Sequence, residues 1–498
     1  MTASQAATAN RLYRTAALRA MEQRARAANP QPTLMERAGR DAAEYAQALM
    51  GPTGKAVLIL AGPGDNGGDA FEVAARLKRS FHRVDVVHLG AGRHQSADAQ
   101  AAAAKWHAAD GRVLNVIPGN VHYDLVIDGL LGIGLKQAVT GPLAQLIEQA
   151  NRIAAPRLAL DIPSGLNADS GAMMGTTFRA THTITFLAPK PGLYTLDGPD
   201  VCGEIRVADL GVSDDKADGT LLDGAVLAQL PLRRPRNFHK GRAGGVAVIG
   251  GATGMVGAAL LAGRAALRLG AGKVFLGLLA EHAPTTDTAN PELMLRRIDA
   301  LLNEPAVNVI AAGPGMGTES AAQRTLTQIL RSDLPVLLDA DALNLVASYA
   351  VLQSAVQTRQ SPTLLTPHPA EAARLLNKAV DEVQADRIAA ALALAQRFRS
   401  LVVLKGNGSV CAHPDGRWWI NPTGNPGMAS AGMGDVLSGM TAALLAQGAT
   451  PEQALLAGVY LHGAAADDLV ANGEGPIGLT AGEVGDRARA LLNRALAG

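Results

Sequence analysis

Short apolar runs alternate with longer amphipathic stretches along most of the chain. In the first half, the runs that predict buried strands are residues 56–61, 84–89, 113–117, 125–127, 157–160 and 183–186. The stretches of helical pattern between them are residues 70–79, 96–108 and 142–153. This alternation predicts an α/β domain with a mostly parallel sheet that is covered by helices on both faces.

The same alternation resumes in the second half. Predicted strands are residues 246–249, 273–278, 308–312, 336–338, 364–366 and 401–405, followed by a near-hairpin of 409–413 and 417–421 around the turn sequence PDG. Predicted helices are residues 258–269, 435–446 and 451–472. This half is therefore a second α/β domain, and its motifs do not repeat those of the first.

A polar segment and then a basic segment separate the two series. VSDDKADG occupies residues 212–219, and LPLRRPRNFHKGR occupies residues 230–242. Such a composition predicts few core contacts, so a domain boundary is expected between about residues 215 and 235. We assign residues 1–220 and 225–498 to the two domains and interpret the charge run as a solvated linker.

Length and composition narrow the class of protein. The 498 residues exceed one ordinary core, so two or three domains are expected from length. A net charge of +1 and 3% aromatic residues do not suggest a nucleic-acid or acidic-membrane partner. Cys202 and Cys411 form no ligand spacing, so a cytoplasmic protein without a disulfide framework or zinc site is expected. The uncharged stretch 243–263 imitates a membrane span in length, but its glycines indicate a strand, a loop and a helix.

The first 30 residues permit two interpretations. They carry five arginines, many alanines and one acidic residue, Glu22, as an organellar transit peptide would. They also fit the first helix of the domain, with Leu12, Ala16, Arg19 and Gln23 on successive turns. The helix is favoured, because the residues that follow continue as ordinary domain sequence.

A glycine-rich stretch near the C-terminus is the first candidate for chemistry. Residues 423–439, TGNPGMASAGMGDVLSG, surround one carboxylate, Asp435, and lead into an apolar helical pattern. Converging backbone N–H groups and the positive end of a helix dipole would cradle phosphate oxygens. A carboxylate there is a poor ligand for an anion but a suitable base beside a reacting phosphoryl group. The stretch alone is equally well explained as a turn in which Asp435 caps the helix.

Other predicted strand ends of the second half carry polar groups as well. They are GPGMG at 313–317, DADALN after the next strand, His368 with Glu371 at a strand-to-helix junction, and Lys405 with Gly406. Each alone is most simply a rigid turn or a solvated strand end. Together with the cradle at Asp435 they favour a site for nucleotide-dependent group transfer.

Three predicted strand ends of the first half form a second candidate site. GPGDNGGD supplies amides with Asn66 and Asp69, VIDGLLGIGL supplies Asp128 and a glycine loop, and LDIPSG supplies Asp161 and Ser164. The oxygens suit a hard cation, and the glycine loops suit a pyrophosphate. Tight turns with locally bonded Asp side chains would explain one such motif, whereas three at one sheet edge favour a site.

These motifs, with LMERAG before them, resemble the N-terminal domain of the bifunctional NAD(P)H-hydrate repair enzymes over residues 12–210. The resemblance implies a Rossmann-like, three-layer αβα epimerase for NADHX and NADPHX, the hydrated forms of the reduced nicotinamide cofactors. It implies that the substrate is contacted by Asp65, Asn66, Gly67, Gly68, Asp69, Gly132, Ile133, Gly134, Leu135, Lys136, Gln137, Ala138 and Asp161. It also implies a potassium ion held by Asn66, Asp128 and Ser164, and Asp161 as the catalytic residue beside the reacting ring.

Two positions of the first half depart from the family pattern. Asp65 stands where the family usually has Asn, and Ala70 stands where Gly is usual. The charge of Asp65 should weaken the binding of a pyrophosphate unless the side chain points away or toward the cation. We expect Ala70 to be harmless.

The second half resembles the C-terminal domain of the same family over residues 238–492, through HKG, GxxGMVGAA, GPGMG, DADALN, TPHPAE, LKGNGS and AGMGDVLSG. This implies a ribokinase-like αβα domain that dehydrates NAD(P)HX with ADP or ATP and Mg²⁺. The implied hydrate-binding residues are Ala258, Gly317, His368 and the catalytic Asp435, and the implied nucleotide-binding residues are Lys405, Gly406, Asn407, Gly408, Ser409 and Gly434. Met433 replaces the usual threonine of the cradle, so backbone amides must suffice there.

The implied chemistry gives each domain one acid/base group. Asp161 would protonate and release the ring hydroxyl, leaving a nitrogen-stabilised cation that takes water back on either face; a ring-opening route would need the same residues. Asp435 would deprotonate the hydroxyl so that it takes a phosphoryl group, and phosphate then leaves more easily than hydroxide.

Two other functions share part of the pattern. A ribokinase-like small-molecule kinase, such as a vitamin-precursor kinase, fused to a nucleotide-binding domain would share GMGD but not the three motifs of the first half. A cofactor-sensing module would bind NAD(P) derivatives but would need neither Asp161 nor Asp435. The repair enzyme is the favoured interpretation, with ADP as the expected donor and a homo-oligomer as the expected assembly.

Overall fold

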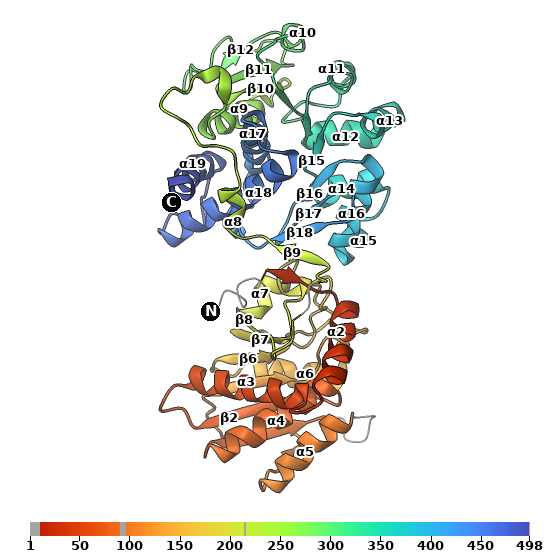
Figure 1. Cartoon of the computed structure of the whole chain (residues 1–498), viewed down its shortest axis with the longest axis vertical. Helices are drawn as coiled ribbons and strands as arrows, with labels where there is room; N and C mark the ends of the chain where they lie inside the picture. The colour runs from red at the N-terminus through yellow and green to blue at the C-terminus, as the bar shows by residue number, and fades with distance from the viewer. Residues whose placement is uncertain (1–9, 90–95, 214–215, 498) are drawn as a thin grey trace. The chain divides into compact units, whose positions relative to one another are not determined.

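The computed structural model describes residues 10–89, 96–213 and 216–497. The chain divides into two compact units, Met1–Thr220 and Leu221–Gly498 (Figure 1). Each unit has its own sheet and its own helical layers, and each is described separately below.

The sheet of the first unit is parallel throughout, in the strand order β4-β3-β2-β5-β6-β7-β8. The strands are β2 (Ala56–Ala61), β3 (Arg83–His88), β4 (Val113–Leu114), β5 (Leu125–Gly129), β6 (Arg157–Leu160), β7 (His182–Phe186) and β8 (Glu204–Ala208). The six expected strands are therefore confirmed. The sequence analysis missed β8, whose partly exposed residues lack the apolar run of a central strand.

Helices cover both faces of this sheet, as expected. They are α2 (Thr15–Ala28), α3 (Leu34–Met50), α4 (Asp65–Arg79), α5 (Ala97–Ala108), α6 (Gly141–Asn151) and the short α7 (Gly198–Cys202). Alternate residues of β2 face opposite layers: Val57 and Ile59 pack with α2 to α5, whereas Leu58 and Leu60 pack with α6. The short strands β1 (Arg11–Leu12) and β9 (Gly219–Leu221) lie outside this sheet.

Two local outcomes concern the first unit. The N-terminal segment forms helix α2, which confirms a first helix there, but Leu12, expected on its first turn, lies in β1; residues 1–9 lie outside the described part. Helix α4 begins at Asp65 and not at Ala70, so residues expected to form a glycine loop make the first turn of the helix. This turn packs closely against α3: a Cβ at position 68 would lie only 2.6 Å from Met35 Cε, so glycine is needed there.

The sheet of the second unit runs in the order β18-β17-β16-β15-β14-β13-β10-β11-β12. It is parallel from β16 to β12 and antiparallel where β17 and β18 join β16. The strands are β10 (Gly245–Gly250), β11 (Lys273–Leu278), β12 (Met294–Leu295), β13 (Val309–Ala312), β14 (Val336–Leu338), β15 (Thr363–Leu365), β16 (Leu401–Leu404), β17 (Ser409–Ala412) and β18 (Trp418–Asn421). The strands expected in this half, including the hairpin, are confirmed, and β12 was missed.

Two helical layers also cover the second sheet (Figure 1). One layer packs on it through α9 (Val256–Arg268), α17 (Met433–Ala446), α18 (Pro451–Ala471) and α19 (Ala481–Ala497). The remaining helices are α8 (Ala225–Ala228), α10 (Ile298–Leu301), α11 (Ser320–Leu330), α12 (Ala340–Ser348), α13 (Ala350–Thr358), α14 (Pro369–Leu376), α15 (Val380–Ala385) and α16 (Arg387–Phe398). In Figure 1, α12, α14 and α16 lie on the side of the sheet opposite α17 and α18.

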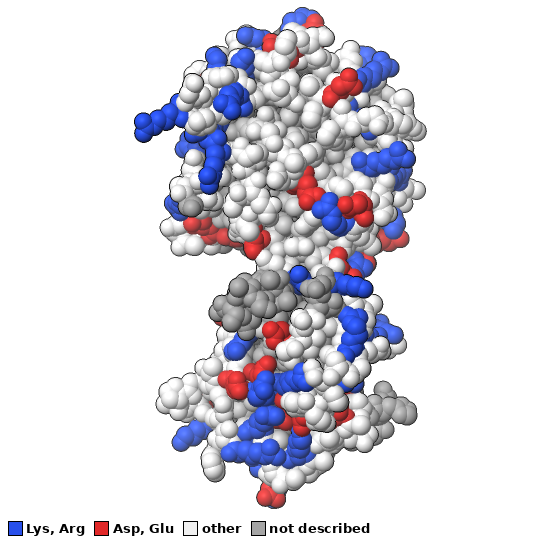
Figure 2. All heavy atoms as spheres, viewed as in Figure 1, with Lys and Arg blue, Asp and Glu red and all other residues white. Residues whose placement is uncertain are grey.

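The uncharged stretch 243–263 contributes to β10 and α9, which confirms a strand and a helix there. Among the described helices, only α18 is long and apolar enough to cross a membrane, and 67% of its most apolar window is buried inside the protein. This burial is typical of a core helix. On the face drawn in Figure 2, acidic and basic side chains lie among one another in both units.

Candidate active sites

The three residues expected to hold a cation in the first unit lie together. Asp128, at the end of β5, is fully buried and accepts hydrogen bonds from Ser164 Oγ and Ser164 N, both at 2.7 Å. Ser164 Oγ in turn accepts a hydrogen bond from Leu131 N at 2.8 Å. Asn66, in the first turn of α4, donates from Nδ2 to Leu131 O at 3.0 Å. The fold therefore joins the ends of β2, β5 and β6 around Leu131.

This cluster has two features that a cation would satisfy. Asn66 Oδ1 is buried and has no hydrogen-bond donor among the described residues. Burial raises the pKa of Asp128 to about 6, although its hydrogen bonds from Ser164 and Leu130 act in the opposite direction. An orphaned amide oxygen beside a buried carboxylate fits a hard cation with oxygen ligands. The described residues contain no group of three or more His, Cys, Asp or Glu side chains suited to a metal ion.

Asp161 follows β6 and pairs with a lysine that the sequence analysis did not single out. Its backbone has φ = +67°, an uncommon conformation for a residue with a side chain. Lys190 is 1% exposed and donates to Asp161 Oδ1, to Thr185 Oγ1 at 2.8 Å and to Phe186 O at 2.8 Å. Lys190 follows β7, so the rule that sites gather at the carboxyl ends of parallel strands would have found it.

The other carboxylate oxygen of Asp161 faces the loop 132–138. A Cβ built on Gly132 would lie 3.8 Å from Asp161 Oδ2 and 3.4 Å from Asn66 Cβ. Gly132 therefore brings the backbone of this loop between the cation cluster and Asp161. Two side chains of the loop, Ile133 and Leu135, pack against apolar clusters of the core. Gly134, Lys136, Gln137 and Ala138 are exposed.

The residues expected to bind substrate at the start of α4 differ from one another in burial and in hydrogen bonding. Asp65 accepts a hydrogen bond from Ser96 Oγ, which also caps α5. The unusual negative charge at position 65 is thus held by a hydroxyl of a neighbouring helix. Gly67 and Gly68 are buried. Burial, with the charges of Asp161 and Asp65, raises the pKa of Asp69 well above its ordinary value.

In the second unit, Asp435 lies in the first turn of α17. Burial raises its pKa to about 6, the charges of Asp339 and Asp341 act in the same direction, and Lys405 opposes them. A carboxylate with this pKa is a competent proton acceptor near neutral pH. The N-terminal turn of α17 adds backbone N–H groups and the positive end of the helix dipole.

A buried ion pair lies directly beside this turn. Lys405 Nζ donates to Asp339 Oδ1 at 2.8 Å, and Ser438 Oγ donates to Asp339 Oδ2 at 2.7 Å. A Cβ on Gly434 would lie 3.1 Å from Lys405 Nζ. Burial alone would lower the pKa of Lys405, but the charges of Asp339 and Glu371 raise it. Asp339 belongs to the DADALN motif and was not itself predicted as a site residue.

His368 caps the N-terminus of α14 in a way that determines its tautomer. Its Nδ1 accepts hydrogen bonds from Ala370 N at 3.1 Å and Glu371 N at 3.4 Å. Nδ1 is therefore unprotonated in the neutral ring, and the proton is on Nε2, 3.3 Å from Glu371 Oε1. Burial lowers the pKa of His368 and raises that of Glu371 to about 7.

The two other expected hydrate-binding residues lie where the loop 313–317 meets α9. A Cβ on Gly315 would lie 3.1 Å from Ala258 Cβ. Gly317 N donates to Asp341 Oδ2 at 2.8 Å, which connects the loop to one of the carboxylates that act on Asp435. Backbone therefore approaches closely at this loop, where larger side chains would not fit.

The expected nucleotide loop 405–409 is supported by an arginine that the sequence analysis missed. Arg387, which is 1% exposed, donates to Leu404 O and Lys405 O, both at 3.3 Å. Gly406 has φ = +143°, and a Cβ there would lie 2.7 Å from Arg387 Nη1. Ser409 Oγ donates to Gly406 O at 3.0 Å and closes the turn. Asn407 is exposed and Gly408 is buried.

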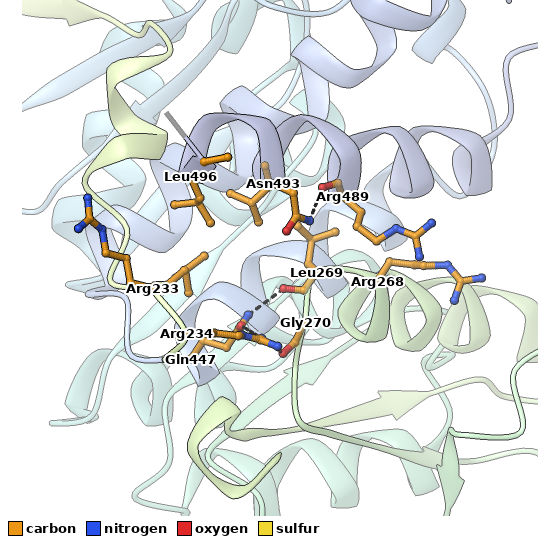
Figure 3. Close-up of a pocket in the computed structure, with 12 residues that line it drawn as sticks. Arg233, Arg234, Arg268, Leu269, Gly270, Gln447, Arg489, Asn493 and Leu496 are labelled. Carbon is orange, nitrogen blue, oxygen red and sulfur yellow. Dashed lines mark hydrogen bonds between the residues drawn. The ribbon is translucent and has the colours of Figure 1, made fainter. Parts of the chain in front are cut away.

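A separate cavity of about 660 Å³ lies elsewhere in the second unit (Figure 3). Its charged lining consists of Arg233, Arg234, Arg268 and Arg489. It contains none of the residues predicted for either site. Arg234 donates to Gly270 O at 2.7 Å and to Gln447 Oε1 at 2.6 Å. This arginine therefore binds the backbone of the turn that follows α9.

Family models match both halves of the chain. The model described as YjeF-related protein N-terminus matches residues 31–192, and the model described as NAD(P)H-hydrate dehydratase matches residues 246–486. A solved ribokinase-like superfamily protein of Enterococcus faecalis is 25% identical with a TM-score of 0.50, covering 57% of this chain and 98% of that one. The ribokinase-like fold expected for the second half is thereby confirmed.

Two curated relatives resemble the chain over most of its length. A Coxiella burnetii protein named bifunctional NAD(P)H-hydrate repair enzyme Nnr is 39% identical over 473 residues, which cover 92% of this chain and 94% of the relative. An Escherichia coli protein of the same name is 40% identical over 450 residues, covering 88% and 85% respectively. The chain therefore belongs to the family of bifunctional NAD(P)H-hydrate repair enzymes.

Proposed function

We propose that this chain repairs hydrated nicotinamide cofactors with one activity in each unit. The first unit interconverts the (R) and (S) epimers of NADHX and NADPHX. The second unit dehydrates the (S) epimer with ADP or ATP and releases phosphate. The observation that carries the proposal is Asp435, a carboxylate with a pKa near 6 at the N-terminus of α17 beside the Lys405–Asp339 pair.

Asp435 is the general base of the dehydration. It removes the proton of the ring hydroxyl, whose oxygen attacks the terminal phosphorus of the nucleotide and forms a phosphate ester. The C–O bond then breaks, the neighbouring ring carbon loses a proton, and NAD(P)H, phosphate and the shortened nucleotide are the products. Gly434 and the first amides of α17 hold the transferring phosphoryl group, and Mg²⁺ on the nucleotide would neutralise its charge.

The remaining residues of the second site bind and orient. The proton of His368 is on Nε2, since its Nδ1 accepts the helix-cap hydrogen bonds; this N–H, 3.3 Å from Glu371 Oε1, is the group that would donate to a polar group of the hydrate. Ala258 and Gly317 leave room for the ring beside the loop 313–317. Lys405 to Ser409 form the nucleotide side, with Arg387 holding the turn.

Asp161 and Lys190 form the acid/base pair of the epimerisation. Asp161 gives a proton to the ring hydroxyl, which leaves as water, and the remaining cation is stabilised by the ring nitrogen. Asp161 then takes a proton from water that returns to either face of that cation. Asn66, Asp128 and Ser164 would hold K⁺, which supplies positive charge for substrate phosphate and fixes the loop that Leu131 begins.

Absorbance recovery from mixed-epimer NADHX tests both activities. With Mg²⁺ and ADP or ATP, the wild-type chain should restore all of the NADH. The Asp161→Ala variant should show a fast partial phase and then slow recovery, because only spontaneous epimerisation resupplies the (S) form. The Asp435→Asn variant should show no fast phase. The absence of recovery by the wild-type chain with either nucleotide would refute the dehydratase.

We also infer that ADP is the preferred donor and that the chain acts in the cytoplasm as a homo-oligomer. Comparing kcat/KM for ADP and ATP tests the first inference. Light scattering coupled to size-exclusion chromatography tests the assembly, and a monomeric mass at micromolar concentration would contradict it.

A further inference from the structure

Helix α2 places charged residues at the first site from a segment that precedes the matched family model, which begins at residue 31. Its apolar face, Leu18, Met21 and Ala25, is buried in the core. Arg19, Glu22 and Arg26 are spaced at i, i+3 and i+7 and form a stripe along the helix. This stripe faces the loop 132–138 and the carboxylates around Asp161, as the following contacts show.

Arg19 reaches the loop itself. A Cβ built on Gly134 would lie 3.9 Å from Arg19 Nη2. Gly134 is two residues from Gly132, whose own Cβ position is 3.8 Å from Asp161 Oδ2. The Arg19 side chain is exposed, and among the residues that the structure describes its guanidinium has no hydrogen-bond or ion-pair partner. Its donors are therefore available to a ligand at this loop.

The charges around the site show why a phosphate would need such a cation. Glu22, Asp65, Asp69 and Asp161 act on one another electrostatically. Lys190 is fully committed to Asp161, Thr185 and Phe186, so its charge does not serve a ligand phosphate. A dinucleotide brings a doubly negative pyrophosphate into these surroundings. A planar guanidinium with several free N–H donors matches phosphate oxygens in geometry and charge.

We propose that Arg19 is a substrate-binding residue of the epimerase that holds the pyrophosphate of NAD(P)HX against the loop at Gly134. This inference rests on the epimerase activity proposed above. It adds helix α2 to the substrate site and assigns the pyrophosphate to the side of the loop that faces this helix.

The slow, epimerase-limited phase of NADHX recovery measures the effect. In Arg19→Gln, the KM of that phase should rise about tenfold, as expected for the loss of a charge-assisted hydrogen bond, with kcat changed less than about twofold. Arg19→Lys should recover part of the lost affinity. The matched control is Arg79→Gln, which removes an exposed arginine at the end of α4 and should leave the KM unchanged.

The same factor should apply to NADHX and NADPHX, since both contain the pyrophosphate. A rise confined to NADPHX would overturn the proposal by assigning Arg19 to the 2′-phosphate, and an unchanged KM for both would overturn it as well. Wild-type KM should increase with ionic strength more steeply than the KM of Arg19→Gln. A wild-type chain without a slow phase faster than spontaneous epimerisation would instead refute the epimerase itself.

Discussion

Lys405 Nζ lies 2.8 Å from Asp339 Oδ1, and this buried ion pair sits beside the first turn of the helix that carries Asp435. Asp339 is 1% exposed, and Ser438 occupies its second oxygen. The pair connects the residue after β14 with the residue after β16, and its two charges also act on Asp435. Asp339 raises the pKa of Asp435 while Lys405 lowers it, so the two partners set the charge of the proposed base in opposite directions.

The Asp339→Asn variant should lose stability because it leaves the ammonium of Lys405 buried without a counter-charge. Removal of one partner from a buried pair costs about 3 kcal/mol, and partial solvent access to Lys405 puts the expected loss nearer about 2 kcal/mol. Urea unfolding of the full chain measures it. Asp299→Asn breaks an exposed pair with Arg297 and should leave the unfolding midpoint unchanged. Equal midpoints for the two variants would refute a structural role for the buried pair.

The pH profile of dehydration should report the pKa of Asp435. A general base acts only when ionised, so kcat/KM should fall as pH decreases through about 6. Because the negative charge of Asp339 raises this pKa, Asp339→Asn should move the acid limb to lower pH. Profiles of kcat/KM for (S)-NADHX at saturating nucleotide provide the measurement. An acid limb that stays in place in Asp339→Asn would contradict the coupling.

Asp435→Asn should lose the dehydration activity and yet be more stable than the wild type at neutral pH. The folded-state pKa of Asp435 is raised from 3.8 to about 6, so ionisation opposes folding. The penalty is absent below pH 3.8, grows between these two pKa values and is constant above about 6, where it reaches at most about 3 kcal/mol. Denaturation midpoints at several pH values should therefore separate the two proteins above pH 5 and converge near pH 4. A constant difference at all pH values would exclude this origin.

The sequence predicted most strands and the edge of each sheet at which polar groups gather. It did so because parallel strands are buried apolar runs and because glycine loops follow them directly. The pairs Asp161–Lys190 and Asp339–Lys405 were not predicted, because their partners are 29 and 66 residues apart and meet only through the strand order. The start of helix α4 was predicted too late, because Gly67 and Gly68 are typical of a loop. In the structure Gly68 lies in the helix, where it allows close packing against Met35. Arg387 was missed because it lies in α16, before β16, and the sequence does not show that it bonds the carbonyl groups at the end of that strand.

Potassium should stabilise the wild-type chain and not the Asn66→Ala variant. Binding to the folded state alone adds about 2.7 kcal/mol when the ion is a hundredfold above its Kd. Thermal unfolding in K⁺ and in an equal concentration of tetramethylammonium separates ion binding from ionic strength. Asn151→Ala is the matched control, because Asn151 bonds Thr177 O and Arg179 N and is not one of the three residues expected to hold the cation. That variant should lose stability and keep its response to K⁺. A wild-type chain that is indifferent to K⁺ would refute the cation site.

Lys190→Met should abolish epimerisation and lower stability together, because Asp161 loses the donor on its Oδ1 and Thr185 Oγ1 loses its partner. Lys190→Arg keeps the charge but places a planar group where Asp161, Thr185 and Phe186 converge on one nitrogen, and should restore stability more than activity. The fast phase belongs to the second unit and should be unchanged in both variants. Normal slow-phase kinetics in Lys190→Met would remove Lys190 from the proton-transfer pair and leave Asp161 to act alone.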